Sequence, residues 1–141
     1  MNRPVLLDTN AIIDLATGLG LSPASMDVAV EASARGALLV SPVSAWEIGN
    51  ISRPRNTRRS IDFLPDPTTW FRRFVDTYHV VLTPLTPEIG IAAAYLPDGI
   101  NADPADRLLT ATARALDAVM ITRDRDILAY SAQGHVRAIA A

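Results

Sequence analysis

The chain has 141 residues and contains neither cysteine nor lysine. Without cysteine it cannot form a disulfide, a thiolate nucleophile or a cysteine-based zinc or iron–sulfur site. Without lysine it cannot be a P-loop NTPase, form a Schiff base or use lysine-dependent phosphoaspartate chemistry. All 13 basic residues are arginine, 15 residues are acidic, and the net charge is −2. Because bulk charge does not favour nucleic acid, any phosphate-binding surface must be local.

Long apolar runs are missing as well. No stretch approaches the roughly 18 uninterrupted apolar residues of a membrane helix, and the N-terminus lacks the apolar segment of a signal peptide. We therefore expect a cytoplasmic protein without a membrane partner. The length and the 49% of hydrophobic residues predict one compact domain over residues 1–141.

Proline marks the start of several helices. Six of the ten prolines follow Ser, Thr or Asp, which accept hydrogen bonds from the free amides of a first helical turn, where proline has no amide to leave unpaired. Thr83-Pro84 and Thr86-Pro87 compete for one start, and Glu88 in the first turn favours the second. Helices are predicted over 9–17, 23–34, 42–50, 67–78, 87–95, 104–116 and 125–131.

Short apolar runs lie between these helices. They cover 5–7, 37–40, 80–82 and 118–121, with a weaker run at 135–139. Runs of this length indicate buried parallel strands. Alternating strands and helices predict an α/β fold, a parallel sheet of four to five strands with helices on both faces.

Acidic residues come directly after two predicted strands, 5–7 and 118–121. In an open parallel sheet, ligands bind beyond the carboxyl ends of the strands, so these side chains should meet at one edge. Two predicted helices bring further acids to that edge. The full set is Asp8, Glu47, Asp103, Asp106, Asp124 and Asp126.

Each acid also has a purely structural interpretation. Asp8, Asp103, Asp124 and Asp126 could cap helices or lie in turns, and this interpretation is strongest for Asp103, which is followed by proline. Glu47 is harder to explain, because a half-buried carboxylate in an apolar stretch is costly without a partner. Capping does not explain why acids from four segments converge.

Converging carboxylates repel one another unless a cation offsets their charge. All candidate ligands here are oxygens, while His79 and His135 are expected away from this edge. Oxygen ligands suit Mg²⁺ or Mn²⁺ rather than Zn²⁺. Such an ion activates water and neutralises charge on a phosphodiester during in-line displacement.

Four short motifs occur in order at 6–10 (Leu-Leu-Asp-Thr-Asn), 46–48 (Trp-Glu-Ile), 103–113 (beginning Asp-Pro-Ala-Asp-Arg) and 121–124 (Ile-Thr-Arg-Asp). Each motif alone is weak. Together, in this order and spacing, they resemble the PIN-domain ribonucleases, and within that family the VapC-like toxins of bacterial type II toxin–antitoxin pairs.

This resemblance implies a PIN-like fold and a metal-dependent endoribonuclease that is homodimeric and inhibited by a small cognate antitoxin. Where these toxins often carry histidine before the Asp-Pro pair, this chain has Asn101, so Asp103 or Asp126 could take a supporting role. The implied catalytic and metal-binding acids are Asp8, Glu47, Asp106 and Asp124, with Thr9, Asn10, Ser44 and Thr122 as polar neighbours.

Three other functions compete with the ribonuclease. A haloacid-dehalogenase-like phosphatase also begins with a strand ending in Asp, but it needs a second Asp where this chain has Asn10. A receiver domain meets the same objection. A non-catalytic PIN fold that binds RNA or protein is the alternative from a different class, and the intact acids argue against it.

Two further segments are candidate contact surfaces. The polar stretch 50–64 predicts an exposed basic loop, which is either a solvated connection or a contact for RNA or a partner protein. Trp70, Phe71, Phe74, Val75 and Tyr78 form an aromatic stripe that either covers the sheet or, with the helix 23–34, offers a face for self-association or an antitoxin helix. The basic residues of the loop are Arg53, Arg55, Arg58 and Arg59.

Overall fold

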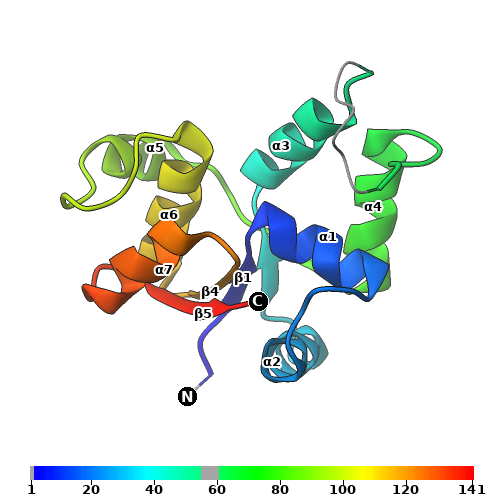
Figure 1. The fold of residues 1–141 in the computed structure, drawn as a ribbon, viewed down its shortest axis with the longest axis horizontal. Helices are drawn as coiled ribbons and strands as arrows, with labels where there is room; N and C mark the ends of the chain where they lie inside the picture. The colour runs from blue at the N-terminus through cyan, green and yellow to red at the C-terminus, as the bar shows by residue number, and fades with distance from the viewer. Residues whose placement is uncertain (1, 55–60) are drawn as a thin grey trace.

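A computed structural model describes residues 2–54 and 61–141. Its centre is a parallel sheet in the order β3-β2-β1-β4-β5 (Figure 1). This confirms the predicted α/β fold, with the larger of the two expected strand numbers. The strands are β1 (Val5–Leu7), β2 (Leu38–Val40), β3 (Val81–Leu82), β4 (Val119–Thr122) and β5 (Arg137–Ala140).

Five of the described helices begin where the Ser/Thr/Asp-Pro pairs predict. Thr86 accepts a hydrogen bond from the Ile89 amide, so the helix starts at the second of the two competing pairs. None of the helices in the described part of the chain is long and apolar enough to cross a membrane. The helices are α1 (Thr9–Thr17), α2 (Pro23–Ala34), α3 (Pro42–Ser52), α4 (Pro67–Thr77), α5 (Pro87–Ala94), α6 (Pro104–Leu116) and α7 (Arg125–Ala132).

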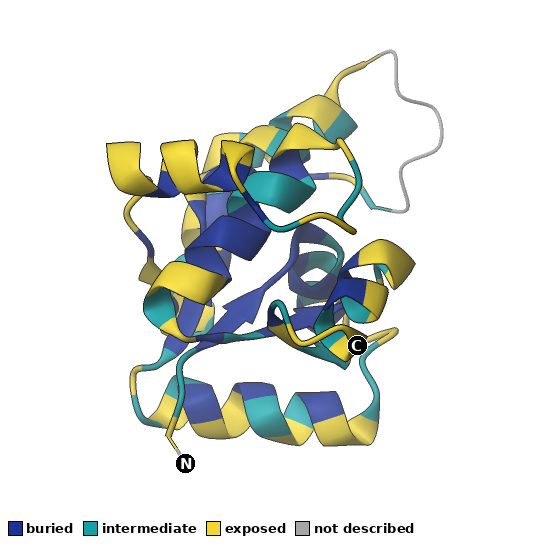
Figure 2. Ribbon diagram, turned by 90° about the vertical axis from the view of Figure 1, so that its left-hand side faces the viewer, coloured by how far each residue is buried: buried dark blue, intermediate teal, exposed yellow. Residues whose placement is uncertain are grey.

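Helices cover both faces of the sheet. Along β1, Val5 and Leu7 pack with α1, α2 and α4, whereas Leu6 between them packs with α6 and α7. This alternation follows from the two-residue repeat of a strand. Figure 2 shows the buried strands between helices whose outer sides are exposed. The two faces therefore have separate apolar cores, and α5 packs on the outside of α6.

The aromatic stripe on α4 belongs to the core. Phe71 and Phe74 are buried, and Trp70, Val75 and Tyr78 pack against the same cluster. Trp70 also meets the Phe63 ring edge-on, with 4.8 Å between ring centroids. The stripe therefore covers the sheet, as one of its two interpretations predicted.

Candidate active site

The candidate site lies at the carboxyl edge of the sheet, where β2, β1 and β4 end side by side (Figure 1). Asp8 follows β1 directly, and β4 ends in Thr122, two positions before Asp124. The strand β2 leads into α3, which carries Ser44 and Glu47. The parallel topology thus brings three of the four acidic segments to one edge, as expected from the sequence.

Asp8 is almost entirely buried, with 4% of its surface exposed. Its carboxylate accepts hydrogen bonds from the Thr9 amide at 2.7 Å and from the Thr122 hydroxyl at 2.6 Å. Asn10 links the same two segments, because its side-chain oxygen accepts a hydrogen bond from the Arg123 amide at 3.2 Å. These bonds fix the orientation of Asp8 between β1 and β4.

Glu47 is held against α1 by Thr9. The buried Thr9 hydroxyl donates a hydrogen bond to Glu47 Oε1 and lies 3.0 Å from the Ser44 hydroxyl oxygen. Because Ser44 and Glu47 are three positions apart on α3, their side chains lie on the same side of that helix. Thr9 and Ser44 therefore orient Glu47 toward the edge where Asp8 lies.

Asp124 caps α7. Its Oδ1 accepts hydrogen bonds from the Asp126 amide at 2.8 Å and the Ile127 amide at 3.2 Å, and its own amide donates to the Thr122 hydroxyl. Asp124 therefore has a capping role, and its contact with Thr122 also ties it to the end of β4.

Asp103 and Asp106 open α6, the fourth acidic segment. Asp103 is the N-cap and accepts a hydrogen bond from the Asp106 amide at 3.0 Å, as the structural interpretation predicted. Asp106 Oδ2 instead accepts a hydrogen bond from Asn101 Nδ2, which also donates to Asp126. In the sequence, Asn101 stands out only as a departure from the family motif. Its contact with α7 depends on a neighbour 25 positions away.

The surroundings of the site disfavour the charged form of three of its acids. Burial raises the pKa of Asp8 and Glu47, and the nearby charges of Asp103 and Asp124 raise both further, against the opposing effect of their hydroxyl partners. Burial and three neighbouring aspartates raise the pKa of Asp106 to about 7. In the absence of a cation, these three carboxyl groups therefore retain protons more readily than exposed acids do.

The arginines near this edge do not offset that charge. Arg123 lies 3.1 Å from the buried Asp14, and Arg107 donates to the carbonyl oxygens of Ala93 and Asn101. In residues 2–54 and 61–141, no ion pair includes Asp8, Glu47, Asp106 or Asp124. The carboxylates and hydroxyls thus present oxygen atoms and a charge deficit that suit a hard divalent cation.

The acids are not packed as one dense cluster. Among the described residues, no three His, Asp or Glu side chains lie close enough together to hold one metal ion. Mg²⁺ commonly binds through one or two carboxylates and keeps several waters. The arrangement therefore fits an ion that takes one or two carboxylate ligands directly and keeps water at its other positions.

Of the predicted basic loop, only its first arginine can be placed. Arg53 follows directly after α3, the helix that carries Glu47. Arg55, Arg58 and Arg59 lie outside the described residues.

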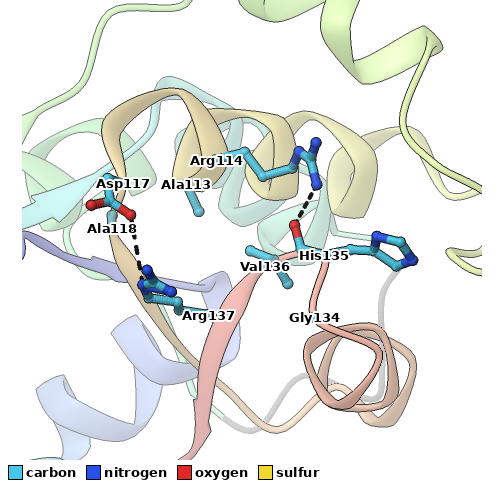
Figure 3. A pocket seen from close by; sticks show the side chains of 8 residues that line it. All are labelled: Ala113, Arg114, Asp117, Ala118, Gly134, His135, Val136 and Arg137. Carbon is cyan, nitrogen blue, oxygen red and sulfur yellow. Dashed lines mark hydrogen bonds and ion pairs between the residues drawn. The ribbon is translucent and has the colours of Figure 1, made fainter.

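The opposite edge of the sheet has a separate hollow of about 240 Å³ (Figure 3). Arg114 at the end of α6 and Arg137 at the start of β5 lie on its two sides, and Arg137 pairs with Asp117. These residues lie at the amino ends of β4 and β5, whereas the candidate active site lies at the carboxyl ends of the strands. The hollow is therefore distinct from the candidate active site.

Comparisons with known proteins agree with this fold. The chain matches the model of the PIN domain over residues 5–132. It is 28% identical over 93 residues to Ribonuclease VapC22 from Mycobacterium tuberculosis, a match that covers 66% of this chain and 67% of that protein. Its fold is similar to a crystal structure of VapBC2 from Rickettsia felis bound to a DNA fragment from their promoter, with a TM-score of 0.66 at 12% identity, covering 96% of this chain and 97% of the other. The family match spans nearly the whole chain, and this protein belongs to the PIN-domain family.

Proposed function

We propose that the protein is a metal-dependent endoribonuclease and the toxin of a toxin–antitoxin pair. The observation that carries the proposal is the convergence of Asp8, Glu47, Asp106 and Asp124 at one edge of a PIN domain, where no described residue forms an ion pair with them. The similarity to a ribonuclease of the VapC group supports RNA as the substrate.

Asp8 and Asp106 are the residues proposed to hold Mg²⁺ or Mn²⁺ most directly. Asp8 follows β1 in a fixed orientation, and Asp106 lies in the first turn of α6, where the helix dipole favours an anion. A bound divalent ion supplies positive charge against the phosphodiester and activates water for hydrolysis.

Glu47 and Asp124 are proposed to complete the site. Thr9 engages Glu47 Oε1, so the second carboxylate oxygen can accept a proton from an attacking water. Capping engages Oδ1 of Asp124, which leaves its Oδ2 for water-mediated contact with the ion. Four polar neighbours keep these groups in place. Thr9 and Thr122 bond Glu47 and Asp8 directly, Ser44 contacts the Thr9 hydroxyl, and Asn10 bonds the Arg123 amide after β4.

A cleavage assay tests this proposal. The purified protein should cut RNA internally with added Mg²⁺ or Mn²⁺, and a chelator should abolish the cleavage. Asp8→Asn should remove most of the activity, because it removes the charge that holds the ion. The far-ultraviolet circular dichroism spectrum should stay unchanged, because Asn keeps the shape of the side chain. Full activity in Asp8→Asn would refute the site assignment, and RNA binding without metal-dependent cleavage would support a non-catalytic PIN fold instead.

The antitoxin is proposed to bind beside α3. An apolar hollow of about 360 Å³ between α3 and α4 is lined by Ala45, Gly49, Phe71 and Leu82, among others, and α3 also carries Glu47. An amphipathic segment in this hollow could place an arginine against the site carboxylates and so block metal binding. Co-purification with the product of a neighbouring small gene, and loss of cleavage in that complex, would test this arrangement.

The protein is also proposed to form a homodimer, through α5 rather than α4. Ile91 lies in α5, and Tyr95 is the residue that directly follows this helix. Their side chains are 64% and 84% exposed, and the spacing of four positions places both on the same side of the helix. Large apolar side chains grouped on one surface are typical of an interface with another protein.

A further inference from the structure

Asn101 lies between two carboxylates that belong to different helices. Its Nδ2 atom is 3.0 Å from Asp106 Oδ2 in α6 and 2.9 Å from Asp126 Oδ2 in α7. An amide nitrogen carries two hydrogens, so it can donate one to each carboxylate. A neutral side chain thus holds together two groups that would otherwise repel each other.

The orientation of this amide is fixed by its other contacts. Asn101 Oδ1 accepts a hydrogen bond from the Asp103 amide at 2.9 Å, which leaves only the nitrogen to face the two carboxylates. The Asn101 carbonyl oxygen accepts a hydrogen bond from Arg107, whose guanidinium also bonds the carbonyl oxygens of Ala93 and Ala94 at the end of α5. The loop before α6 is therefore held from both sides, and it presents Asn101 to the site.

We propose that Asn101 is a positioning residue that holds Asp106 and Asp126 as one pair for the divalent cation, and that Asp126 contributes to cation binding through this pairing. The inference rests on the proposed function, which makes Asp106 a metal ligand. Asp126 is exposed, so without the amide its side chain is free to rotate away from Asp106 and lower the charge repulsion between them. Cation binding would then be weaker, because part of its free energy would be used to bring the two carboxylates back together.

Titration of the metal-free protein with Mn²⁺, followed by isothermal calorimetry, tests the pairing without depending on cleavage. Asn101→Ser is the informative variant, because a serine hydroxyl can still accept the Asp103 amide in the same turn but cannot bridge the two carboxylates. We expect it to bind Mn²⁺ about 10-fold more weakly than the wild type, the usual effect of losing a group that orients a metal ligand. Asn2→Ala, which removes an exposed amide at the opposite end of β1, should bind as the wild type does.

A double-variant cycle separates pairing from independent effects. Asp126→Asn should also weaken Mn²⁺ binding, and Asn101→Ser combined with Asp126→Asn should be no weaker than the weaker single variant, because both changes break the same pair. Losses that multiply in the double variant would overturn the pairing. If Asn101→Ser does not fold, as judged by thermal unfolding in chelator, Asp126→Asn alone decides, and unchanged Mn²⁺ affinity would overturn the inference.

Asp106→Asn distinguishes this inference from the proposed function. If Asp106→Asn abolishes Mn²⁺ binding while Asn101→Ser and Asp126→Asn bind normally, the metal site stands and the positioning role fails. If Asp106→Asn also binds Mn²⁺ normally, the proposed metal site itself is wrong.

Discussion

The Thr122 hydroxyl donates a hydrogen bond of 2.6 Å to Asp8, across a sequence separation of 114 positions. The same hydroxyl oxygen accepts a hydrogen bond from the Asp124 amide at 2.9 Å. One fully buried side chain at the end of β4 thus orients an acid after β1 and an acid at the start of α7.

Replacing Thr122 with valine should therefore damage both stability and activity. The change keeps the side-chain shape but leaves the buried Asp8 carboxylate and the Asp124 amide short of a partner, a cost of about 1–3 kcal/mol for a buried group. Urea unfolding in chelator and RNA cleavage with Mg²⁺ are the two measurements. Thr110→Val is the matched control, because Thr110 is equally buried but its hydroxyl has no hydrogen-bond partner among the described residues. Equal effects of the two substitutions would contradict the role of Thr122.

The stability of the metal-free protein should fall as the pH rises toward neutrality. The pKa of Asp106 is about 7 in the folded protein and 3.8 for the ordinary side chain, so between these values the folded state keeps a proton that the unfolded chain has released. Raising the pH through this window therefore favours unfolding. Thermal unfolding from pH 5 to about pH 8 in chelator measures the effect.

Asp106→Asn supplies the comparison for this pH dependence, since asparagine does not titrate. Its melting temperature should fall less between the two pH values than that of the wild type, and added Mg²⁺ should stabilise the wild type more at the higher pH. Parallel curves for the two proteins would show that Asp106 titrates as an ordinary acid.

The basic loop predicted from the sequence should hold the RNA backbone. The acidic edge repels phosphates, and four arginines occur between positions 53 and 59. Changing Arg53, Arg55, Arg58 and Arg59 together to glutamine should weaken RNA binding and flatten its salt dependence, because fewer counterions are released. Filter binding at several salt concentrations measures the slope, and Mn²⁺ titration checks that the metal site is intact. An unchanged slope would indicate a solvated connection.

Dimerisation should depend on the exposed apolar side of α5. Ile91→Asp should convert a dimer to a monomer in light scattering, without lowering the melting temperature, because Ile91 is 64% exposed and contributes little to the core. Val30→Asp is the matched substitution on α2, where Val30 is 59% exposed. If Val30→Asp dissociates the dimer and Ile91→Asp does not, the interface lies on α2. A wild-type monomer would refute the homodimer.

Much of the fold follows from local signals in the sequence. Five of the helices start at a Ser, Thr or Asp before proline, and the apolar runs give the strands, although the last strand begins at Arg137 rather than at His135. The acids after β1 and β4 could be placed because parallel strands end at one edge. The proline after Asp103 also predicts that Asp103 caps a helix, and the hydrogen bond that it accepts from the Asp106 amide confirms this.

Other features depend on contacts that no local pattern encodes. The stripe on α4 is equally compatible with a core and with an interface, and only the position of Phe63 and the sheet decides between them. The bridging contact of Asn101 requires the loop before α6 to lie against the start of α7. The spacing of the acids could not be read from the sequence either, since it depends on how closely α3, α6 and the ends of the strands approach one another.

Three acids of the candidate site also begin helices: Asp8 caps α1, Asp103 caps α6 and Asp124 caps α7. Alanine at any of these positions would lose a helix cap, typically about 1 kcal/mol, together with the charge. Asparagine caps nearly as well as aspartate and removes only the charge. Alanine scanning would therefore merge a folding defect with a chemical one at this edge of the sheet, whereas Asp-to-Asn changes keep the two apart.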